Sequence, residues 1–204
     1  MTEKDFGGMG LAGTSPSMTS ASTDDTSITA PVNKIIPFSC VDGPGNRTAV
    51  FLQGCNQNCL YCHNPDTWKM DGGDEVTADE ILKRALRFKP YWGKDGGITI
   101  SGGEPLLQID FVIELFKKAK ELGINTCIDT AGNPFTKEKP FFSKFEELMK
   151  YTNLLLLDLK EINPARHKDL TGFDNSNIIE MANIGTYFDD KIDFRCKEDI
   201  VKYS

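Results

Sequence analysis

Three cysteines stand close together in this sequence: Cys55, Cys59 and Cys62 fall within eight residues. Their thiolates can therefore reach one centre without any long-range folding. Soft thiolate ligands at this spacing select zinc or an iron–sulfur cluster. Three cysteines on a four-iron cluster leave one iron without a protein ligand. That open coordination position predicts chemistry at the cluster in addition to electron transfer.

The cysteines also admit simpler interpretations. A structural zinc could take the three thiolates and His63, although structural zinc usually draws its ligands from two separated pairs. A disulfide framework is disfavoured, because six cysteines in 204 residues are sparse and no other feature indicates export. Cys127 lies in an apolar run and is interpreted as an inert buried thiol, an interpretation that also stays open for Cys40 and Cys196.

The pattern of apolar residues predicts alternating strands and helices. Core strands are predicted at residues 48–52, 97–101, 124–129 and 153–157, with 192–195 as a candidate fifth strand and 34–38 as a short extended piece. Helices are predicted at 81–88, 108–122, 137–150, 164–170 and 177–188, with a capping box at 77–80. Because strand alternates with helix, the expected fold class is α/β with parallel strands joined by right-handed crossovers.

Polar residues follow the predicted strands at the point where each strand ends. The cysteine loop follows the first strand and Glu104 the second, while Asp129 follows the third, and Asp158 and Lys160 follow the fourth. In a parallel sheet or barrel these positions face one rim, where such folds place active sites. This convergence favours an enzyme over a zinc-ribbon binding module, because a structural zinc needs no carboxylates at three other strand ends.

The same positions have ordinary structural interpretations. Gly102 and Gly103 alone would indicate a tight turn, whereas a functional role would be the close approach of backbone to a ligand amino group. Asp129 could cap a helix or start a turn. Asp158 and Lys160 could form an exposed ion pair that contributes little to stability.

The extended motif resembles a known family. The pattern Cys-x3-Cys-x-aromatic-Cys is the signature of radical S-adenosylmethionine (SAM) enzymes. The string Val-Asp-Gly-Pro-Gly at 41–45, and residues 53–68 with Tyr-Cys-His-Asn-Pro inside them, resemble the pyruvate formate-lyase activating enzymes, which are glycyl radical enzyme activases. The similarity runs from about residue 35 to about residue 184. It implies the radical SAM partial (β/α) barrel.

The resemblance also implies where cofactors and partners bind. Cys55, Cys59 and Cys62 would hold a [4Fe-4S] cluster. The residues implied in SAM binding are Tyr61, Cys62, His63, Gly102, Gly103, Glu104, Asp129, Asp158, Leu159 and Lys160, with aromatic burial as the alternative for Tyr61. A monovalent cation is implied near Asp129, Thr130 and Asp158. Contacts with a partner protein are implied for Asp42, His63 and Asn64.

The implied reaction is the activation of pyruvate formate-lyase. The reduced cluster would cleave SAM to a 5′-deoxyadenosyl radical, which removes hydrogen from a glycine of the partner, and no catalytic side chain is implied beyond the cluster and SAM. Electrons would come from a flavodoxin or ferredoxin. An activase of another glycyl radical enzyme is one alternative, although residues 68–97 lack the extra cysteines that many of those carry. A non-catalytic metal-binding or interaction protein is another alternative.

Composition narrows the class of protein further. Hydrophobic residues make up 39% and charged residues 26% of the chain, which is ordinary for a globular protein. The net charge of −7 without a dense basic run argues against nucleic acid or anionic membrane as the main partner. The absence of a secretory pattern, with free thiols, favours the cytoplasm.

The two ends of the chain differ from the middle. Residues 1–33 are rich in Ser, Thr and Gly, and they are expected to form a disordered tail and not an Arg-rich transit peptide. Residues 34–204 are expected to form the radical SAM domain. Because the resemblance fades after about residue 185, we expect a C-terminal truncation that leaves about four to five βα units and an incomplete barrel.

Overall fold

The computed structural model describes residues 27–185 and 192–198. Seven strands in these residues form one sheet in the order β3-β1-β2-β4-β5-β6-β7. The strands are β1 Thr29–Ser39, β2 Arg47–Leu52, β3 Asp74–Thr77, β4 Gly97–Gly102, β5 Thr126–Thr130, β6 Leu154–Leu159 and β7 Asp193–Glu198. The α-helices are α1 Ala78–Leu86, α2 Ile109–Glu121, α3 Phe141–Met149, α4 Pro164–Thr171 and α5 Ser176–Gly185. Short 3-10 helices are η1 Pro65–Thr67, η2 Lys89–Tyr91 and η3 Pro105–Gln108.

The central strands agree with the sequence prediction. β2, β4, β5, β6 and β7 pair in parallel, and β7 is the predicted fifth strand. The apolar runs become strands because both faces are covered, so apolar side chains are needed at consecutive positions. The expected fold class is therefore confirmed, as an open, partial α/β barrel.

Of the two antiparallel strands, β1 was predicted only in part, as the extended piece at 34–38, and β3 was not predicted. β1 pairs with both β2 and β3, and it begins at Thr29, where Ala30 and Val32 are buried. The expected tail boundary at residue 33 is therefore wrong: Thr29 and the residues after it belong to the sheet, because Val76 and its neighbours on β3 supply the partner. Residues 1–26 lie outside the described residues.

The helices match their predictions with shifted ends. α1 begins at the predicted capping box, in which Thr77 and Glu80 each bind the other's backbone N–H. α3 starts at Phe141, later than the predicted residue 137, because Pro140 occupies its N-cap position. α5 is described as far as Gly185, so the predicted positions 186–188 lie outside the described residues. No helix in the described part of the chain is long and apolar enough to cross a membrane.

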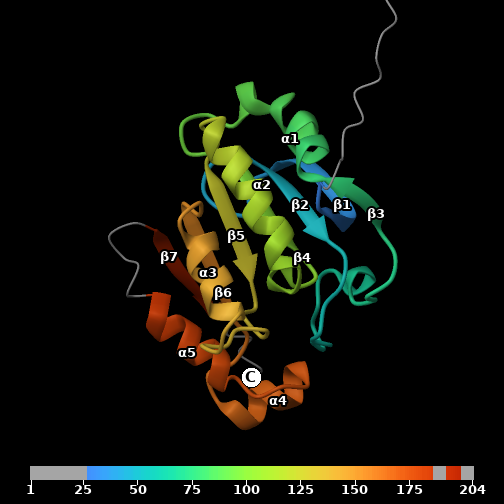
Figure 1. Ribbon diagram of the computed structural model, residues 1–204. Coiled ribbons are helices and arrows are strands. Elements are labelled where there is room, and N and C mark those ends of the chain that lie inside the picture. Colours follow the sequence, from blue (N-terminus) through green and yellow to red (C-terminus); the bar gives the residue numbers. More distant parts are fainter. Residues whose placement is uncertain (1–26, 186–191, 199–204) are drawn as a thin grey trace, which may run out of the picture.

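The two faces of the sheet carry different residues. Helix α2 lies over β4 and β5 (Figure 1), and its Phe111 and Leu115 share the main core with Ile100 and Ile128 of those strands. Successive side chains of a strand point to opposite faces, so Thr99 lies on the face away from α2, which we call the inner face. There Cys127, Leu154 and Leu156 form a separate small buried cluster. The inner face is therefore apolar in its middle and carries Asp129 and Asp158 towards the carboxyl ends of β5 and β6.

Candidate functional site

The predicted site residues gather at the carboxyl ends of the parallel strands. The cysteine loop, which we define as residues 53–64, follows β2, and Gly102 ends β4, Thr130 ends β5 and Leu159 ends β6. In Figure 1 the arrowheads of β2 and β5 point towards the end of the molecule where α4 lies. The expected convergence of these segments at one edge follows from the parallel pairing.

Gly103, the first residue after β4, packs against the start of the cysteine loop. The backbone N–H of Gly103 donates to the carbonyl of Leu52 (2.9 Å), and that of Glu104 donates to the carbonyl of Gly54 (2.8 Å). A Cβ at Gly103 would lie 1.9 Å from the Gly54 carbonyl oxygen. A side chain there would push β4 and the cysteine loop apart, so Gly103 has a structural role independent of any ligand.

Glu104 ties β4 to the end of β5. Its carboxylate, 1% exposed, accepts hydrogen bonds from the Thr130 hydroxyl (2.5 Å), the Ala131 N–H (2.9 Å) and the Leu106 N–H (2.9 Å). Burial raises the pKa of Glu104 to about 7, although these three donors oppose the rise. Both carboxylate oxygens are occupied by protein donors, so the side chain positions the neighbouring turns.

Asp158 and Lys160 form an ion pair beside the cysteine loop. Their side chains are 20% and 17% exposed, so the alternative interpretation as an ordinary exposed ion pair does not apply. The Tyr61 hydroxyl donates to the carbonyl of Lys160 (3.3 Å), and the Lys160 ammonium lies 5.5 Å from the centre of the Tyr61 ring. Burial favours a lower pKa for Lys160, but Asp158, Tyr61 and Cys59 together raise it. One carboxylate oxygen of Asp158 is buried without a hydrogen-bond partner.

Leu159 at the end of β6 and Asp129 on the adjacent β5 differ in whether a ligand could reach their side chains. The side chain of Leu159 is 5% exposed and lies in the main core, so only its backbone is available to a ligand. Its implied role in SAM binding would therefore be carried by its backbone. Asp129 lies on the adjacent strand and accepts a hydrogen bond from Ser101 (3.4 Å).

The three residues expected to contact a partner protein lie apart. The Asp42 carboxylate bonds to Ser39, which pairs with Arg47 at the amino end of β2. Asn64 accepts from Lys34 (2.9 Å), which pairs with the carboxyl end of β2. His63 is exposed in the cysteine loop. The structure brings His63 and Asn64 together and leaves Asp42 towards the other end of the strand.

Sequence reasoning missed the helix turn that holds the cysteine loop. The backbone N–H groups of Asn58 and Leu60 donate to the carbonyls of Thr171 (3.3 Å) and Leu170 (3.0 Å) in the last turn of α4. His167 of this charged helix is fully buried, and its Nδ1 bonds to the Phe173 carbonyl (2.8 Å). α4 is rich in charged residues, so its composition gave no signal that one face would be covered.

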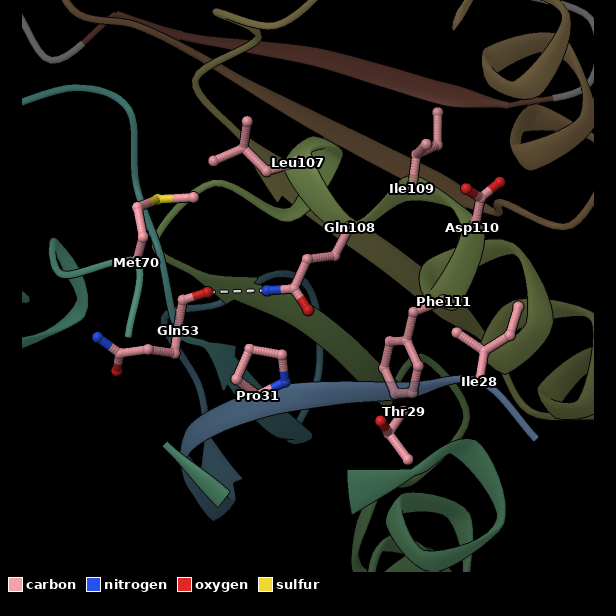
Figure 2. Close-up of a pocket in the computed structure, with 10 residues that line it drawn as sticks. All are labelled: Ile28, Thr29, Pro31, Gln53, Met70, Leu107, Gln108, Ile109, Asp110 and Phe111. Atoms are coloured by element: carbon pink, nitrogen blue, oxygen red, sulfur yellow. Dashed lines mark hydrogen bonds between the residues drawn. The ribbon is translucent and has the colours of Figure 1, made fainter. Parts of the chain in front are cut away.

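A separate pocket lies behind the cysteine loop. Its volume is about 330 Å³, and it lies between the start of β1, Met70 and the start of α2. Figure 2 shows Ile28 and Phe111 on one side and the Gln108 amide donating to the Gln53 carbonyl (2.8 Å). The pocket contains none of the predicted site residues.

Comparison with known proteins decides the family. Residues 41–179 match the family described as a 4Fe-4S single cluster domain. This chain belongs to that 4Fe-4S family. The chain is also 52% identical over 161 residues to a pyruvate formate-lyase-activating enzyme of Streptococcus mutans, covering 78% of this chain and 61% of the relative. A relative of the same name from Clostridium pasteurianum is 51% identical over 142 residues, covering 69% of this chain and 57% of the relative.

These relatives confirm the resemblance inferred from the motifs, and the chain spans less than two thirds of their length. Among solved structures, Streptococcus suis SuiB bound to S-adenosylmethionine is similar with a TM-score of 0.55 and 21% identity, over 74% of this chain and 32% of that protein. At this identity the similarity supports the fold alone.

The donor atoms of the cysteine loop fit an iron–sulfur cluster. Cys55, Cys59 and Cys62 are free thiols. Burial raises the pKa of Cys55 to about 12, and Glu104, Cys59 and Cys62 contribute to the rise. Three thiolates in one short loop would carry like charges, and a positively charged metal centre would relieve their repulsion.

In the described residues, no group of three or more His, Cys, Asp or Glu side chains is arranged to hold a metal ion. The choice between a cluster and a single zinc ion therefore rests on the family match. Residues 41–179 match a 4Fe-4S single cluster domain, and in a [4Fe-4S] cluster different thiolates bind different irons. This match favours a 4Fe-4S cluster over a structural zinc with His63 in the cysteine loop.

Proposed function

We propose that this chain forms the cluster- and SAM-binding part of an enzyme that activates pyruvate formate-lyase. The observation that carries the proposal is that the cysteine loop, Gly102–Glu104, Asp129 and the Asp158–Lys160 pair lie at one edge of the sheet, in a chain 52% identical to an enzyme of that name. Relatives with this name favour pyruvate formate-lyase over other glycyl radical enzymes as the partner.

The proposed roles follow the chemistry of each group. Cys55, Cys59 and Cys62 hold the [4Fe-4S] cluster. Bound there, the cluster supplies the electron that cleaves SAM to the 5′-deoxyadenosyl radical, which removes hydrogen from the partner's glycine. The ammonium of Lys160 is held in place by Asp158 and can bind the SAM carboxylate or ribose. The unpaired carboxylate oxygen of Asp158 is available to a donor or a cation.

Glycines and aromatic residues complete the proposed SAM site. Gly102 and Gly103 keep backbone close to the cysteine loop, and Glu104 fixes their turn. Tyr61 and His63, on either side of Cys62, border the site from the cysteine loop, and the Leu159 backbone borders it from β6. A monovalent cation near Asp129, Thr130 and Asp158 would compensate the two carboxylates.

The proposed partners are a glycyl radical enzyme and a flavodoxin- or ferredoxin-type electron donor. His63 and Asn64 are the proposed partner contacts in the cysteine loop, and Asp42 a contact at a distance from them. Reduced thiols at Cys40, Cys55, Cys59, Cys62 and Cys127 support a reducing compartment such as the cytoplasm.

Anaerobic reconstitution tests the proposal. With iron, sulfide, SAM, dithionite and pyruvate formate-lyase, the chain should assemble about four irons and four sulfides, as the cluster's composition requires. A glycyl radical should then appear in the electron paramagnetic resonance (EPR) spectrum. The Cys59→Ala variant should lose the cluster, whereas Cys127→Ala, with its thiol in the small core cluster of the inner face, should keep it. Stoichiometric zinc without sulfide would refute the proposal.

A further inference from the structure

Gln57 is a buried side chain inside the cysteine loop. It is 1% exposed, and its Oε1 lies 3.6 Å from the Sγ of Cys59, which donates its thiol hydrogen to it. Its Nε2 is buried and has no hydrogen-bond partner among the residues that the structure describes. An amide buried so deeply normally satisfies both of its ends, so the unpaired nitrogen calls for a physical explanation.

Metal ligation would change Cys59 from a hydrogen-bond donor to the Gln57 amide into an acceptor. When Sγ binds iron, the S–H bond breaks, an S–Fe bond forms and the proton leaves to solvent. The sulfur then has no hydrogen to donate, and Oε1 would place its partial negative charge against a thiolate. An amide has two ends of nearly equal shape, so a half-turn about the last side-chain bond exchanges Oε1 and Nε2 within the same space.

We propose that Gln57 is a positioning residue for the cluster, whose Nε2–H donates to the iron-bound thiolate of Cys59. The inference rests on the proposed function only in taking Cys59 as a cluster ligand. In this arrangement the unpaired Nε2 gains an acceptor and the thiolate gains a donor. Hydrogen bonds to the sulfurs are one of the factors that set the reduction potential of such clusters, because they stabilise the more negative, reduced state.

The reduction potential distinguishes this role from simple packing. Gln57→Met keeps an unbranched side chain of similar length and removes the donor. Gln57→Glu keeps the shape and replaces the donor with an acceptor. Asn58→Met is the matched control, because Asn58 is the next residue in the same loop, its side chain is exposed and only its backbone N–H is bonded.

We expect the midpoint potential of the reconstituted cluster, from an EPR-monitored redox titration, to shift to more negative values in Gln57→Met and further in Gln57→Glu. The potential of Asn58→Met should equal that of the wild type. The cluster of Gln57→Met should also be lost faster to a chelator than those of the wild type and Asn58→Met. Wild-type potentials in both Gln57 variants, at full iron and sulfide content, would overturn the inference.

A second measurement needs no variant to fold. The sequence contains three glutamines, and the amide nitrogens of Gln53 and Gln108 already bond to backbone carbonyls. Cell-free synthesis with side-chain 15N-glutamine should give a 15N coupling in the pulsed EPR spectrum of the reduced wild-type cluster. A wild-type cluster without this coupling overturns the inference alone. A cluster that shows the coupling but yields no glycyl radical overturns the proposed function alone, and a chain that assembles no cluster overturns both.

Discussion

Glu104 is a carboxyl group whose environment disfavours its charge. Burial raises its pKa from 4.5 to about 7, and its three protein donors moderate the rise. Between these pH values the folded chain holds a proton that the unfolded chain has lost. Because the folded state binds more protons, the free energy of unfolding falls as pH rises through this window and levels off above it.

This behaviour gives a prediction for cluster-free protein. Between pH 4.5 and 7 Glu104 should contribute a fall of roughly 2–4 kcal/mol in unfolding free energy, since one pKa unit corresponds to about 1.4 kcal/mol. Urea unfolding at several pH values should show a smaller fall for Glu104→Gln than for the wild type. The control is Glu121→Gln, an exposed position on α2, which should reproduce the wild-type profile. Identical profiles for all three proteins would contradict the prediction.

Single residues divide into those that the sequence could predict and those that it could not. The cysteines, Gly103 and Glu104 were found because each follows a recognisable apolar strand. Gln57 and His167 were not found, because a polar residue in a loop or a charged helix carries no sign of burial. They lie in the cysteine loop and in α4, two segments that are far apart in the chain and joined by hydrogen bonds in the fold.

Two glycines test how tightly the elements are joined. Gly172, at the C-cap of α4, has a φ of +88°, and an added Cβ would meet nothing within 4 Å. Gly172→Ala should therefore cost only the strain of a left-handed residue, about 1–2 kcal/mol. Gly103→Ala should be much worse, because its Cβ would lie 1.9 Å from the Gly54 carbonyl oxygen.

Thermal unfolding and iron content measure the two effects. Gly172→Ala should lower the melting temperature by a few degrees and keep the cluster, in line with about 2–4 °C per kcal/mol for a chain of this size. Gly103→Ala should displace the start of the cysteine loop, so we expect loss of iron binding before loss of fold. Full iron content in Gly103→Ala would show that the close contact between β4 and the cysteine loop is dispensable.

Helices and strands were predictable where a local pattern of residues in the sequence indicates them. Parallel strands appear as apolar runs, so the starts of β4 and β6 were placed within one residue. Only residues 34–38 of β1 were predicted, because this strand begins inside a polar stretch. β3 was not predicted, because it pairs with a strand distant in sequence. The register of such pairs depends on contacts that no local pattern records.

At the scale of the whole molecule, the candidate site and a buried structural arginine lie at opposite edges of the sheet. At the edge opposite the cysteine loop, Arg47 is fully buried. Its guanidinium donates to the Thr99 hydroxyl (2.7 Å), the Ile98 carbonyl (2.7 Å) and the Asn125 side chain (2.9 Å), so it joins β2 to β4 and to the start of β5. Burial lowers the pKa of Arg47, because removal from water disfavours the charged guanidinium.

Replacing this arginine should destabilise the whole domain. Arg47→Met leaves several buried acceptors without donors, and we expect a loss of at least roughly 3 kcal/mol, because each hydrogen bond to a charged group contributes about 1.5–3 kcal/mol. Urea unfolding measures the loss. Arg84→Met, at an exposed position of α1, should change stability by less than about 0.5 kcal/mol. Similar stabilities of the two variants would contradict the role given to Arg47.

The hydrogen bonds from Asn58 and Leu60 to the end of α4 bear on the order of events during synthesis of the chain. On the ribosome, the three cysteines emerge well before the helix turn that anchors their loop, by on the order of ten seconds at ordinary rates of synthesis. During that interval the thiols are exposed on a loop without its support. We therefore expect stable metal loading to follow emergence of α4. Ribosome-bound chains stalled before and after its exit, exposed to iron and sulfide, should differ in the iron they retain.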